Sequence, residues 1–233
     1  MQSQIAIVGA GRLGTVLSRA LATGPPLGRE ADAQGADVVL LCVPDAEIAA
    51  AARAVAPGAL VGHCSGATTL GVLAPHEAFS LHPLMTVPPG ADPAVLEGAG
   101  CAVAGSTPRA SSVALGLAAR LGMEAVVIAE DDRAAYHAAA SMASNFLVAL
   151  EGAAERVGAG AGLHRALLAP LVRATVENWA AQGPNRALTG PIARGDEQTV
   201  ERHREALRER TPELLPLYDA LAAAMRELAG APA

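Results

Sequence analysis

The chain has 233 residues, of which 52% are hydrophobic and 17% charged, a balance that allows one large globular domain or two smaller ones. Its formal net charge of −6 and the absence of a dense basic run argue against nucleic acid and against an anionic membrane surface as partners. All 17 basic residues are arginine, which excludes every mechanism that needs a lysine.

Cys42, Cys64 and Cys101 form no CxxC pair, which predicts free thiols in a reducing, cytoplasmic environment. The opening residues MQSQIAIVGAG carry no basic leader followed by a cleavable apolar stretch, so we expect no secretion signal. No apolar run reaches the roughly 18 residues that a membrane-spanning helix needs. We therefore expect no association with a membrane.

Short apolar runs alternate with helical runs in the first half of the chain, and only helical patterns follow residue 131. This order predicts an α/β fold, with a mostly parallel sheet covered by helices, followed by an all-α domain. The expected domains are 1–129 and 130–233. We expect strands near 4–9, 37–43, 59–64, 78–82, 100–105 and 124–129, and helices near 12–23, 45–56, 68–74, 108–121, 131–158, 163–182, 196–209 and 212–229.

Gly9, Gly11 and Gly14 form a GxGxxG motif between the first strand and the first helix. The first glycine permits the tight turn, the second lets the backbone approach a pyrophosphate, and the third lets the helix pack on the strand. The motif therefore predicts a Rossmann-type dinucleotide site at residues 9–14, which includes Arg12 and Leu13. A glycine turn that only packs well and binds nothing is the alternative.

The next 14 residues, Gly24 to Asp37, are too few for the strand, helix and strand that a complete dinucleotide fold has here. They leave room for at most one short strand or an extended crossing. Arg29 is the nearby base that could contact the phosphate of NADP, whereas Glu30 or Asp32 could contact the ribose of NAD. A solvated loop charge is the alternative for each of these three residues.

The segment VVLLCVPDAEI predicts a buried strand that ends at Val43 and Pro44. In dinucleotide folds the carboxyl end of this strand lies beside the cofactor, so we place both residues in the cofactor site. Asp45 is positioned to cap the following helix, which is a structural role.

Ser65 and Gly66 follow the next strand and could present a hydroxyl and backbone amides to a carbonyl or carboxylate. The order GHCSG places the serine one position too late for the nucleophile elbow of a hydrolase. His82 stands at a strand end and is either a proton donor or a hydrogen-bonded structural residue. His63, Cys64, His82 and His137 have no recognised zinc spacing, so we predict no metal site.

The predicted helix 131–158 is mostly small and apolar, yet His137, Ser141, Ser144 and Asn145 fall on one stripe of a 3.6-residue helix. Polar groups aligned in this way face water, a partner or a ligand, and we assign them to the ligand side. Close helix packing through small residues is the alternative. Farther on, Arg194 in the loop ALTGPIARG is a candidate contact for a substrate carboxylate, or an ordinary surface arginine.

The motifs GAGRLG, LCVPDAEI, GHCSG, FSLHPL, YHAAASMASNFLVAL and ALTGPIARGD occur in this order over nearly the whole chain. In these motifs the chain resembles the Rossmann-like oxidoreductases that carry a helical C-terminal domain of unassigned function. They belong to the 6-phosphogluconate dehydrogenase-like superfamily, near pyrroline-5-carboxylate reductase and the β-hydroxyacid dehydrogenases. The resemblance implies NADP-linked reduction of a small carbonyl or imine, with NAD as a possible cofactor, in a homodimer whose helical domains complete the site.

Ketopantoate, the substrate associated with some of these proteins, is our leading candidate. The chain departs from the β-hydroxyacid dehydrogenase pattern KxxxN, because Ser141 stands where the lysine would be while Asn145 is kept. The expected mechanism has Asn145 orienting the substrate near Ser65 and Gly66, while His137, or as second choice His82, supplies the proton. An imine reductase of the pyrroline-carboxylate type and a non-catalytic dimeric nucleotide- or metabolite-binding protein are the alternatives.

Overall fold

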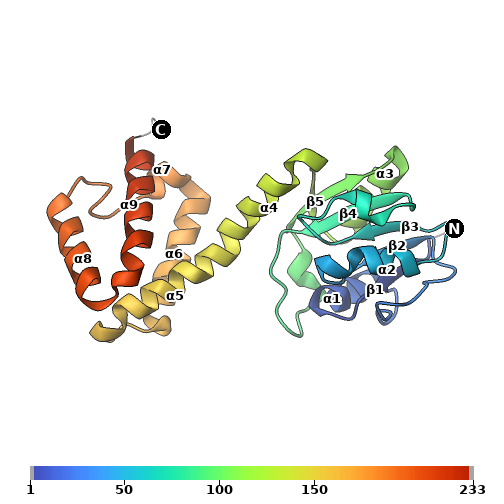
Figure 1. Cartoon of the computed structure of the whole chain (residues 1–233), viewed down its shortest axis with the longest axis horizontal. Helices are drawn as coiled ribbons and strands as arrows, with labels where there is room; N and C mark the ends of the chain where they lie inside the picture. The colour runs from blue at the N-terminus through green and yellow to red at the C-terminus, as the bar shows by residue number, and fades with distance from the viewer. Residues whose placement is uncertain (1–2, 231–233) are drawn as a thin grey trace. The chain divides into compact units, whose positions relative to one another are not determined.

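The computed structural model describes residues 3–230; the first two residues, part of the opening segment considered for a secretion signal, lie outside them. The chain divides into two compact units, Met1–Ser144 and Asn145–Ala233, which are described separately (Figure 1). The division falls within a run of consecutive helical segments, some residues after the boundary at 129 and 130 that we expect from the sequence.

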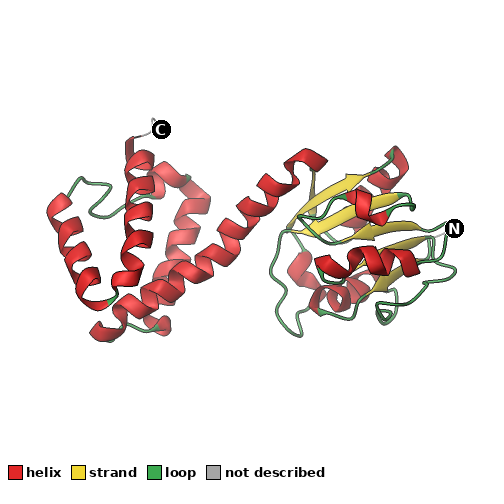
Figure 2. Cartoon of the chain, in the orientation of Figure 1, coloured by secondary structure: helices red, strands yellow, loops and turns green. Residues whose placement is uncertain are grey.

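The first unit is built on a six-stranded sheet with the strand order β1-β2-β3-β4-β5-β6 (Figure 2). All neighbouring strands are parallel except β4 and β5, which are antiparallel. The predicted α/β class with a mostly parallel sheet is therefore confirmed. The strands are β1 (Ile5–Val8), β2 (Val38–Leu41), β3 (Leu60–His63), β4 (Ala78–Pro83), β5 (Gly100–Gly105) and β6 (Glu124–Val127).

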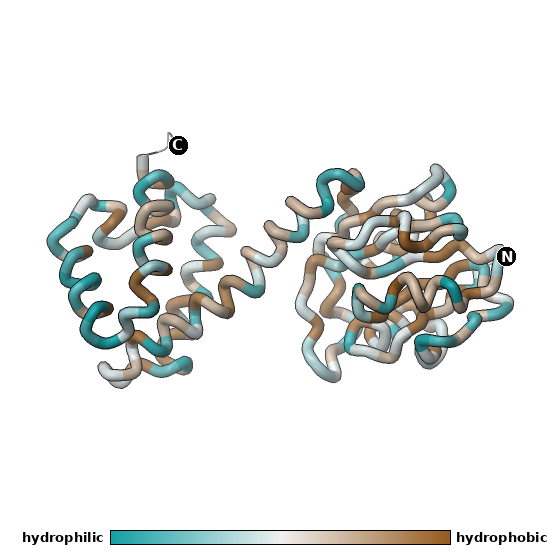
Figure 3. The backbone as a smooth tube through the Cα atoms, viewed as in Figure 1, coloured by the Kyte–Doolittle hydropathy of each residue, from teal (hydrophilic) through white to brown (hydrophobic). Residues whose placement is uncertain are grey.

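Both faces of the sheet are covered, because alternate residues of the apolar strands point to opposite sides. On one face Ile7 and Leu40 pack in a core with residues of α1 (Arg12–Leu21) and α3 (Pro108–Arg120). On the other face Val8 and Val39 pack with residues of α2 (Ile48–Ala54). The strand sequences IAIV of β1 and VVLL of β2 are wholly apolar, and Figure 3 shows hydrophobic segments of this unit in brown. The unbroken apolar runs in the sequence correspond to this burial on two sides.

The shortened segment after α1 retains a single residue of strand pairing. Leu27 forms an isolated parallel bridge with Val8. Its amide donates to Ile7 at 2.8 Å, and its carbonyl accepts from Gly9 at 2.9 Å. One bridge thus replaces the strand, helix and strand of a complete fold, so the truncation expected after the first helix is confirmed. As a result β1, which lies inside the sheet of complete folds, is the first strand in the order.

Only helical segments follow β6 in the described residues, and the predicted helices are found with small shifts. One predicted helix, 68–74, is instead a four-residue 3₁₀ segment, η2 (Leu70–Leu73). Within residues 3–230 no helix is both long enough and apolar enough to cross a membrane. The segments are η4 (Glu130–Asp132), α4 (Arg133–Ser141), the π-helical η5 (Met142–Phe146), α5 (Leu147–Gly158), η6 (Ala159–Ala161), α6 (Arg165–Gln182), α7 (Pro184–Ala187), α8 (Glu197–Arg210), η7 (Pro212–Leu214) and α9 (Leu215–Gly230).

Candidate active site

The glycine turn joins β1 to α1, and its three glycines have three different surroundings. Gly9 has a φ of +107°, and a Cβ there would lie 2.4 Å from the carbonyl oxygen of Cys42. A Cβ on Gly14 would lie 2.0 Å from the carbonyl oxygen of Gly9. At Gly11 nothing lies within 4 Å of the Cβ position. Gly9 and Gly14 therefore allow the helix to pack on the strand, whereas Gly11 keeps the space before the helix open.

The amino end of α1 offers backbone donors to this open space. Gly11 is the N-cap of α1, and no side chain caps the helix. The first N–H groups of an α-helix have no acceptor within the helix, and its dipole favours an anion at this end. Gly11, Arg12 and Leu13 all line one cavity. Their arrangement suits a phosphate group on the amino end of the helix.

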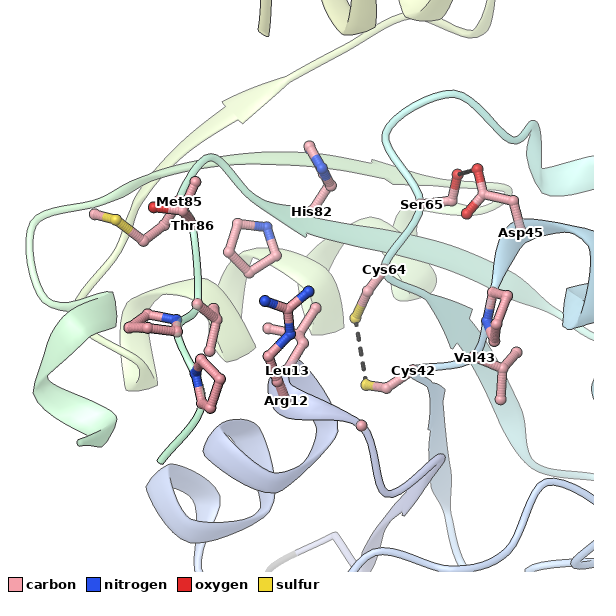
Figure 4. A pocket seen from close by; sticks show the side chains of 16 residues that line it. Arg12, Leu13, Cys42, Val43, Asp45, Cys64, Ser65, His82, Met85 and Thr86 are labelled. Atoms are coloured by element: carbon pink, nitrogen blue, oxygen red, sulfur yellow. Dashed lines mark hydrogen bonds between the residues drawn. The ribbon is translucent and has the colours of Figure 1, made fainter. Parts of the chain in front are cut away.

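The cavity lies in the first unit and has a volume of about 850 Å³. It extends from the start of α1 past the ends of β2 and β3 to His82 of β4, and Figure 4 shows its side chains at close range. A wall that the sequence did not predict comes from Met85 to Pro89, directly after β4. The lining residues are Gly11, Arg12, Leu13, Cys42, Val43, Pro44, Asp45, Cys64, Ser65, His82, Pro83, Met85, Thr86, Val87, Pro88 and Pro89.

Cys42 and Cys64 face each other in this cavity, with their Sγ atoms 3.6 Å apart (Figure 4). They follow Leu41 and His63, which are register partners on β2 and β3. The hydrogen bond with Cys42, together with burial, raises the pKa of the Cys64 thiol well above its ordinary value. A thiol held in this way stays protonated, so Cys64 is unsuited to act as a thiolate nucleophile.

Ser65 is buried, and its hydroxyl is fully engaged by its own surroundings. It donates to Asp45 at 2.7 Å and lies 2.9 Å from Thr68 Oγ1. The same oxygen accepts from the amides of Ala67 and Thr68. The hydroxyl expected to face a ligand is thus used to form the turn. The prediction that Asp45 caps the next helix is wrong: its carboxylate accepts from Ser65, and Pro44 takes the cap position of η1 (Asp45–Glu47).

His82 and Tyr136 form the shortest polar contact at the end of the cavity. Nδ1 of His82 on β4 lies 2.6 Å from the hydroxyl of Tyr136 on α4, and the rings meet edge to face at a centroid distance of 5.6 Å. Burial raises the pKa of Tyr136 to about 12, so its hydroxyl keeps its proton at neutral pH. Burial and the neighbouring His137 lower the pKa of His82, so its ring is mostly neutral.

Gly66 brings His82 and His137 together. A Cβ on Gly66 would lie 2.9 Å from Cε1 of His82 and 3.1 Å from Cδ2 of His137. The ring centroids of the two histidines are 6.4 Å apart. Three residues that the sequence assigns to the site are therefore close in space, and only glycine leaves room for both rings.

Arg133 is a buried cation whose charge acts on both His63 of β3 and His82 of β4. Its guanidinium donates to Glu130 and to Ser80, both at 2.6 Å. Burial, and then the charge of Arg133, lower the pKa of His63 to about 4. His63 is fully buried, and its Nδ1 accepts from the Ser65 amide at 3.2 Å. Arg133 thus favours neutral imidazoles on this side of the site.

The remaining predicted site residues are not among those that line the cavity. Ser141 ends α4 and is half-buried, whereas Asn145 lies in η5 and is exposed. The π-helical turn interrupts the 3.6-residue periodicity on which the predicted stripe depends. Arg29 forms an ion pair with Glu47 at 2.6 Å and does not line the cavity. Arg194 is exposed in a loop of the second unit, just before Asp196, which caps α8.

Within the described part of the chain, no three His, Cys, Asp or Glu side chains gather closely enough to hold a metal ion. Tyr136 lies next to the predicted polar stripe in the sequence, but no sequence pattern assigns a role to Tyr136 or to Arg133. The one signal available for Arg133 was a charged residue at the start of a helix otherwise made of small residues. Nothing in the spacing of Tyr136 pairs it with a strand more than fifty residues earlier in the chain.

Among solved structures, protein TM1727 from Thermotoga maritima is 25% identical and has a TM-score of 0.81, covering 97% of this chain and 98% of that chain. Protein BF3122 from Bacteroides fragilis, named as a candidate NADP oxidoreductase, is 20% identical with a TM-score of 0.80 and the same coverage. Pyrroline carboxylate reductase from Plasmodium falciparum, with NADP bound, is 13% identical with a TM-score of 0.59, covering 98% and 99%. No curated protein sequence matches the chain.

Two family models match the sequence itself. A Rossmann-like domain matches residues 23–88, in the unit that holds the glycine turn and the cavity. A domain of unknown function (DUF2520) matches residues 99–225, which is more than half of the chain. The resemblance to Rossmann-like proteins with a dedicated helical C-terminal domain is thereby confirmed, and the chain belongs to the DUF2520 family.

Proposed function

We propose that the chain is an NADP-dependent reductase of a small carbonyl compound, with a 2-keto acid such as ketopantoate as the leading candidate substrate. The observation that carries this proposal is the single cavity of about 850 Å³ that joins the open glycine turn at Gly11 to His82. One end suits a phosphate, and the other offers a histidine for proton transfer. The candidate oxidoreductase BF3122 and the NADP-bound pyrroline carboxylate reductase share this fold.

The residues present fit a nicotinamide dinucleotide. Gly9, Gly11 and Gly14 have the surroundings that the three glycines of the motif require, and Gly11 leaves space for a pyrophosphate beside the α1 amides. Val43 and Pro44 line the cavity next to the turn. A bound dihydronicotinamide would supply a hydride to the substrate. A cofactor at this position leaves His82 and the wall from Met85 to Pro89 to surround the substrate.

Arg29 is our proposed contact for the 2′-phosphate that distinguishes NADP from NAD. Its pair with Glu47 is exposed, with 63% of the Arg29 side chain accessible, so the guanidinium can change partners at small cost. We expect Arg29→Ala to weaken NADPH binding about tenfold and to leave NADH binding unchanged, measured by thermal shift or calorimetry. Arg53→Ala, which removes an exposed arginine of the same unit, is the control. Equal losses for both cofactors would assign Arg29 another role.

His82 is the residue that we propose as proton donor to the substrate. It lines the cavity, whereas His137 is exposed and contributes no surface to it. We therefore favour His82 over His137 as the proton donor, which is the reverse of the order expected from the sequence. We infer that His137 acts indirectly, by lowering the pKa of the adjacent His82. Asn145 stays our proposed substrate-orienting residue and Arg194 our proposed carboxylate contact. Ser65 and Gly66 form the turn against which the substrate would rest.

An imine reductase is the second candidate, and the likeness to pyrroline carboxylate reductase favours it. An iminium accepts a hydride without needing a proton from the protein, whereas a carbonyl needs one. The deciding experiment compares NADPH oxidation with ketopantoate, other 2-keto acids and pyrroline-5-carboxylate. Turnover of keto acids that is lost in His82→Gln supports a carbonyl reductase. Turnover confined to cyclic imines, or binding of NADPH without any turnover, would exclude it.

We also propose that the protein is a cytoplasmic homodimer joined through its helical unit. The free thiols of Cys42, Cys64 and Cys101 support a reducing location. Helix α6 contains no buried residue, although it is 18 residues long. Its exposed side chains include Leu167, Leu171 and Trp179, at 57%, 64% and 56%. An apolar surface of this kind is typical of a protein interface, and a second copy of the chain would cover it.

A further inference from the structure

The hydroxyl of Tyr136 has one hydrogen-bond partner among residues 3–230, and that partner is Nδ1 of His82 at 2.6 Å. If Nδ1 carried the proton and donated it, the phenol hydrogen would have no acceptor in the described protein. If the phenol donates to a bare Nδ1, both groups are satisfied. The contact therefore favours a neutral ring with its proton on Nε2.

The charges around His82 favour the same neutral ring. His137 and Arg133 of α4 oppose a second proton on the imidazole, and Asp45 of η1 is the one group that favours it. Burial has the largest effect, and together with the charges of His137 and Arg133 it lowers the pKa of His82 below its ordinary value. Tyr136 faces the ring directly and is uncharged at neutral pH because its own pKa is about 12. An imidazolium is thus a minor species here.

Nε2, the other ring nitrogen, has no hydrogen-bond partner among residues 3–230 and is not sealed from solvent. Because His82 lines the cavity, Nε2 is the atom that can reach a ligand there. A neutral imidazole with its proton on Nε2 would present one donor to a substrate oxygen.

We propose that Tyr136 is a positioning residue, which holds His82 in the neutral Nε2–H tautomer and returns a proton to Nδ1 when Nε2 gives one up. The role in turnover rests on the proposed carbonyl reduction. The tautomer itself does not depend on any activity, because both partners are in place without cofactor.

The proton transfers balance within the chain. A bound dihydronicotinamide would supply the hydride to the carbonyl carbon, and the electron pair of the C=O π bond would then move to the oxygen. That oxygen takes the proton from Nε2 of His82, and Nδ1 takes the proton of the Tyr136 hydroxyl. The phenolate then takes this proton back from Nδ1, while water entering the cavity protonates Nε2, so that the starting tautomer is restored. The overall transfer is favourable, since a free alkoxide is a stronger base than a phenolate whose conjugate acid has a pKa of about 12.

The test uses Tyr136→Phe, which keeps the ring that packs against His82 and removes only the hydroxyl. The first readout is the ¹⁵N spectrum of the histidines in the full-length protein without cofactor, with the His82 signals assigned from His82→Gln. We expect a single Nε2–H tautomer in the wild type and a mixture of tautomers in Tyr136→Phe. Tyr218→Phe is the matched control: Tyr218 bonds Nδ1 of His203 at 3.0 Å, with the rings also edge to face. It should alter only the His203 signals.

The second readout is turnover of the keto acid with NADPH. We expect Tyr136→Phe to lower kcat about 10- to 100-fold, with KM for the carbonyl and Kd for NADPH changed less than twofold. The residual activity should fall as pH rises. Without the Tyr136 hydroxyl, a neutral ring that donates from Nε2 would be left as an imidazolate, so the imidazolium becomes the effective donor. The wild type should keep its activity from pH 6 to 9. An unchanged tautomer in Tyr136→Phe overturns the proposal. If the wild type lacks reductase activity, the proposed function fails, and the ¹⁵N spectra still decide the role of Tyr136.

Discussion

His63 shows how a single buried group connects this site to the stability of the fold. The residue ends β3, has no exposed surface and lies near the buried cation Arg133. Both features lower its pKa to about 4, while an unfolded chain leaves a histidine at its ordinary value near 6.5. Between these two values the unfolded chain binds a proton that the folded chain refuses. The contribution of His63 to the free energy of unfolding is therefore fully present above pH 6.5, and it is lost as the pH falls toward 4.

We expect His63 to remove about 2 kcal/mol of stability between pH 7 and pH 5. The measurement is urea unfolding at both pH values for the wild type and for His63→Asn, which lacks the titrating ring. It is followed by circular dichroism, because the chain's one tryptophan, Trp179, belongs to the helical unit. The variant should lose less stability on acidification than the wild type. His164→Asn, which replaces an exposed histidine, is the control, and equal pH slopes for His63→Asn and the wild type would refute the argument.

At this scale the sequence predicts which residue types are present but not which side chains meet. His82 and Gly66 are predicted site residues because His82 stands at the end of one easily recognised strand and Gly66 follows another. Their contact with Tyr136 and His137 depends on how α4 lies against β4, which no local pattern contains. Ser65 illustrates the opposite case, since its hydroxyl stands at the expected position but is used by Asp45 and two amides of its own turn.

At the scale of elements, two glycines of the turn between β1 and α1 have different roles. Gly14 allows the helix to pack on the strand, and Gly11 leaves space for a ligand. A Cβ on Gly14 would meet the Gly9 carbonyl, which belongs to the backbone and cannot move aside. A Cβ on Gly11 would meet nothing within 4 Å, and the φ of −70° at Gly11 is one that alanine adopts readily. Substituting alanine at these two positions should therefore have different effects, on folding stability at Gly14 and on ligand binding at Gly11.

We expect Gly14→Ala to destabilise the fold by about 2 kcal/mol or more, since helix and strand must move apart. Gly11→Ala should fold like the wild type, because its methyl group enters empty space. That space is where a pyrophosphate would approach, so Gly11→Ala should weaken NADPH binding about tenfold or more. Urea unfolding and a thermal shift with NADPH measure the two effects. A Gly11→Ala protein that binds NADPH as tightly as the wild type would place the cofactor elsewhere.

The positions of the strands were predictable because this sheet is buried on both faces. Each strand is then a short apolar run bounded by glycine, proline or polar residues, as in VVLLCVP around β2. The interruption of the long helix at η5 was not predictable in this way. The segment MASNF contains no proline or glycine, and π-helical turns have no characteristic amino-acid composition that would identify them in a sequence.

At the scale of the whole molecule, the two units differ in how many hydrophobic side chains each buries within itself. The first unit has two extensive cores, one on each face of the sheet. The core found in the second unit is a small cluster around Ile192, Val200 and Ala222. Figure 3 shows α8 as a largely hydrophilic helix, in agreement with its many charged residues. Burial inside the helical unit alone therefore leaves many of its apolar side chains exposed.

A second copy of the chain is the partner that we expect to cover them. Leu171→Glu places a charge in the middle of the exposed face of α6, where Leu171 is 64% accessible. In a dimer this charge would be buried without a partner, which costs several kcal/mol and favours separate chains. We expect light scattering to show a dimer for the wild type and a monomer for Leu171→Glu. Leu115→Glu on α3, an exposed leucine of the first unit at 40%, should stay dimeric. A wild-type chain that is monomeric at all concentrations would refute the dimer, whereas a Leu171→Glu chain that stays dimeric would move the interface away from α6.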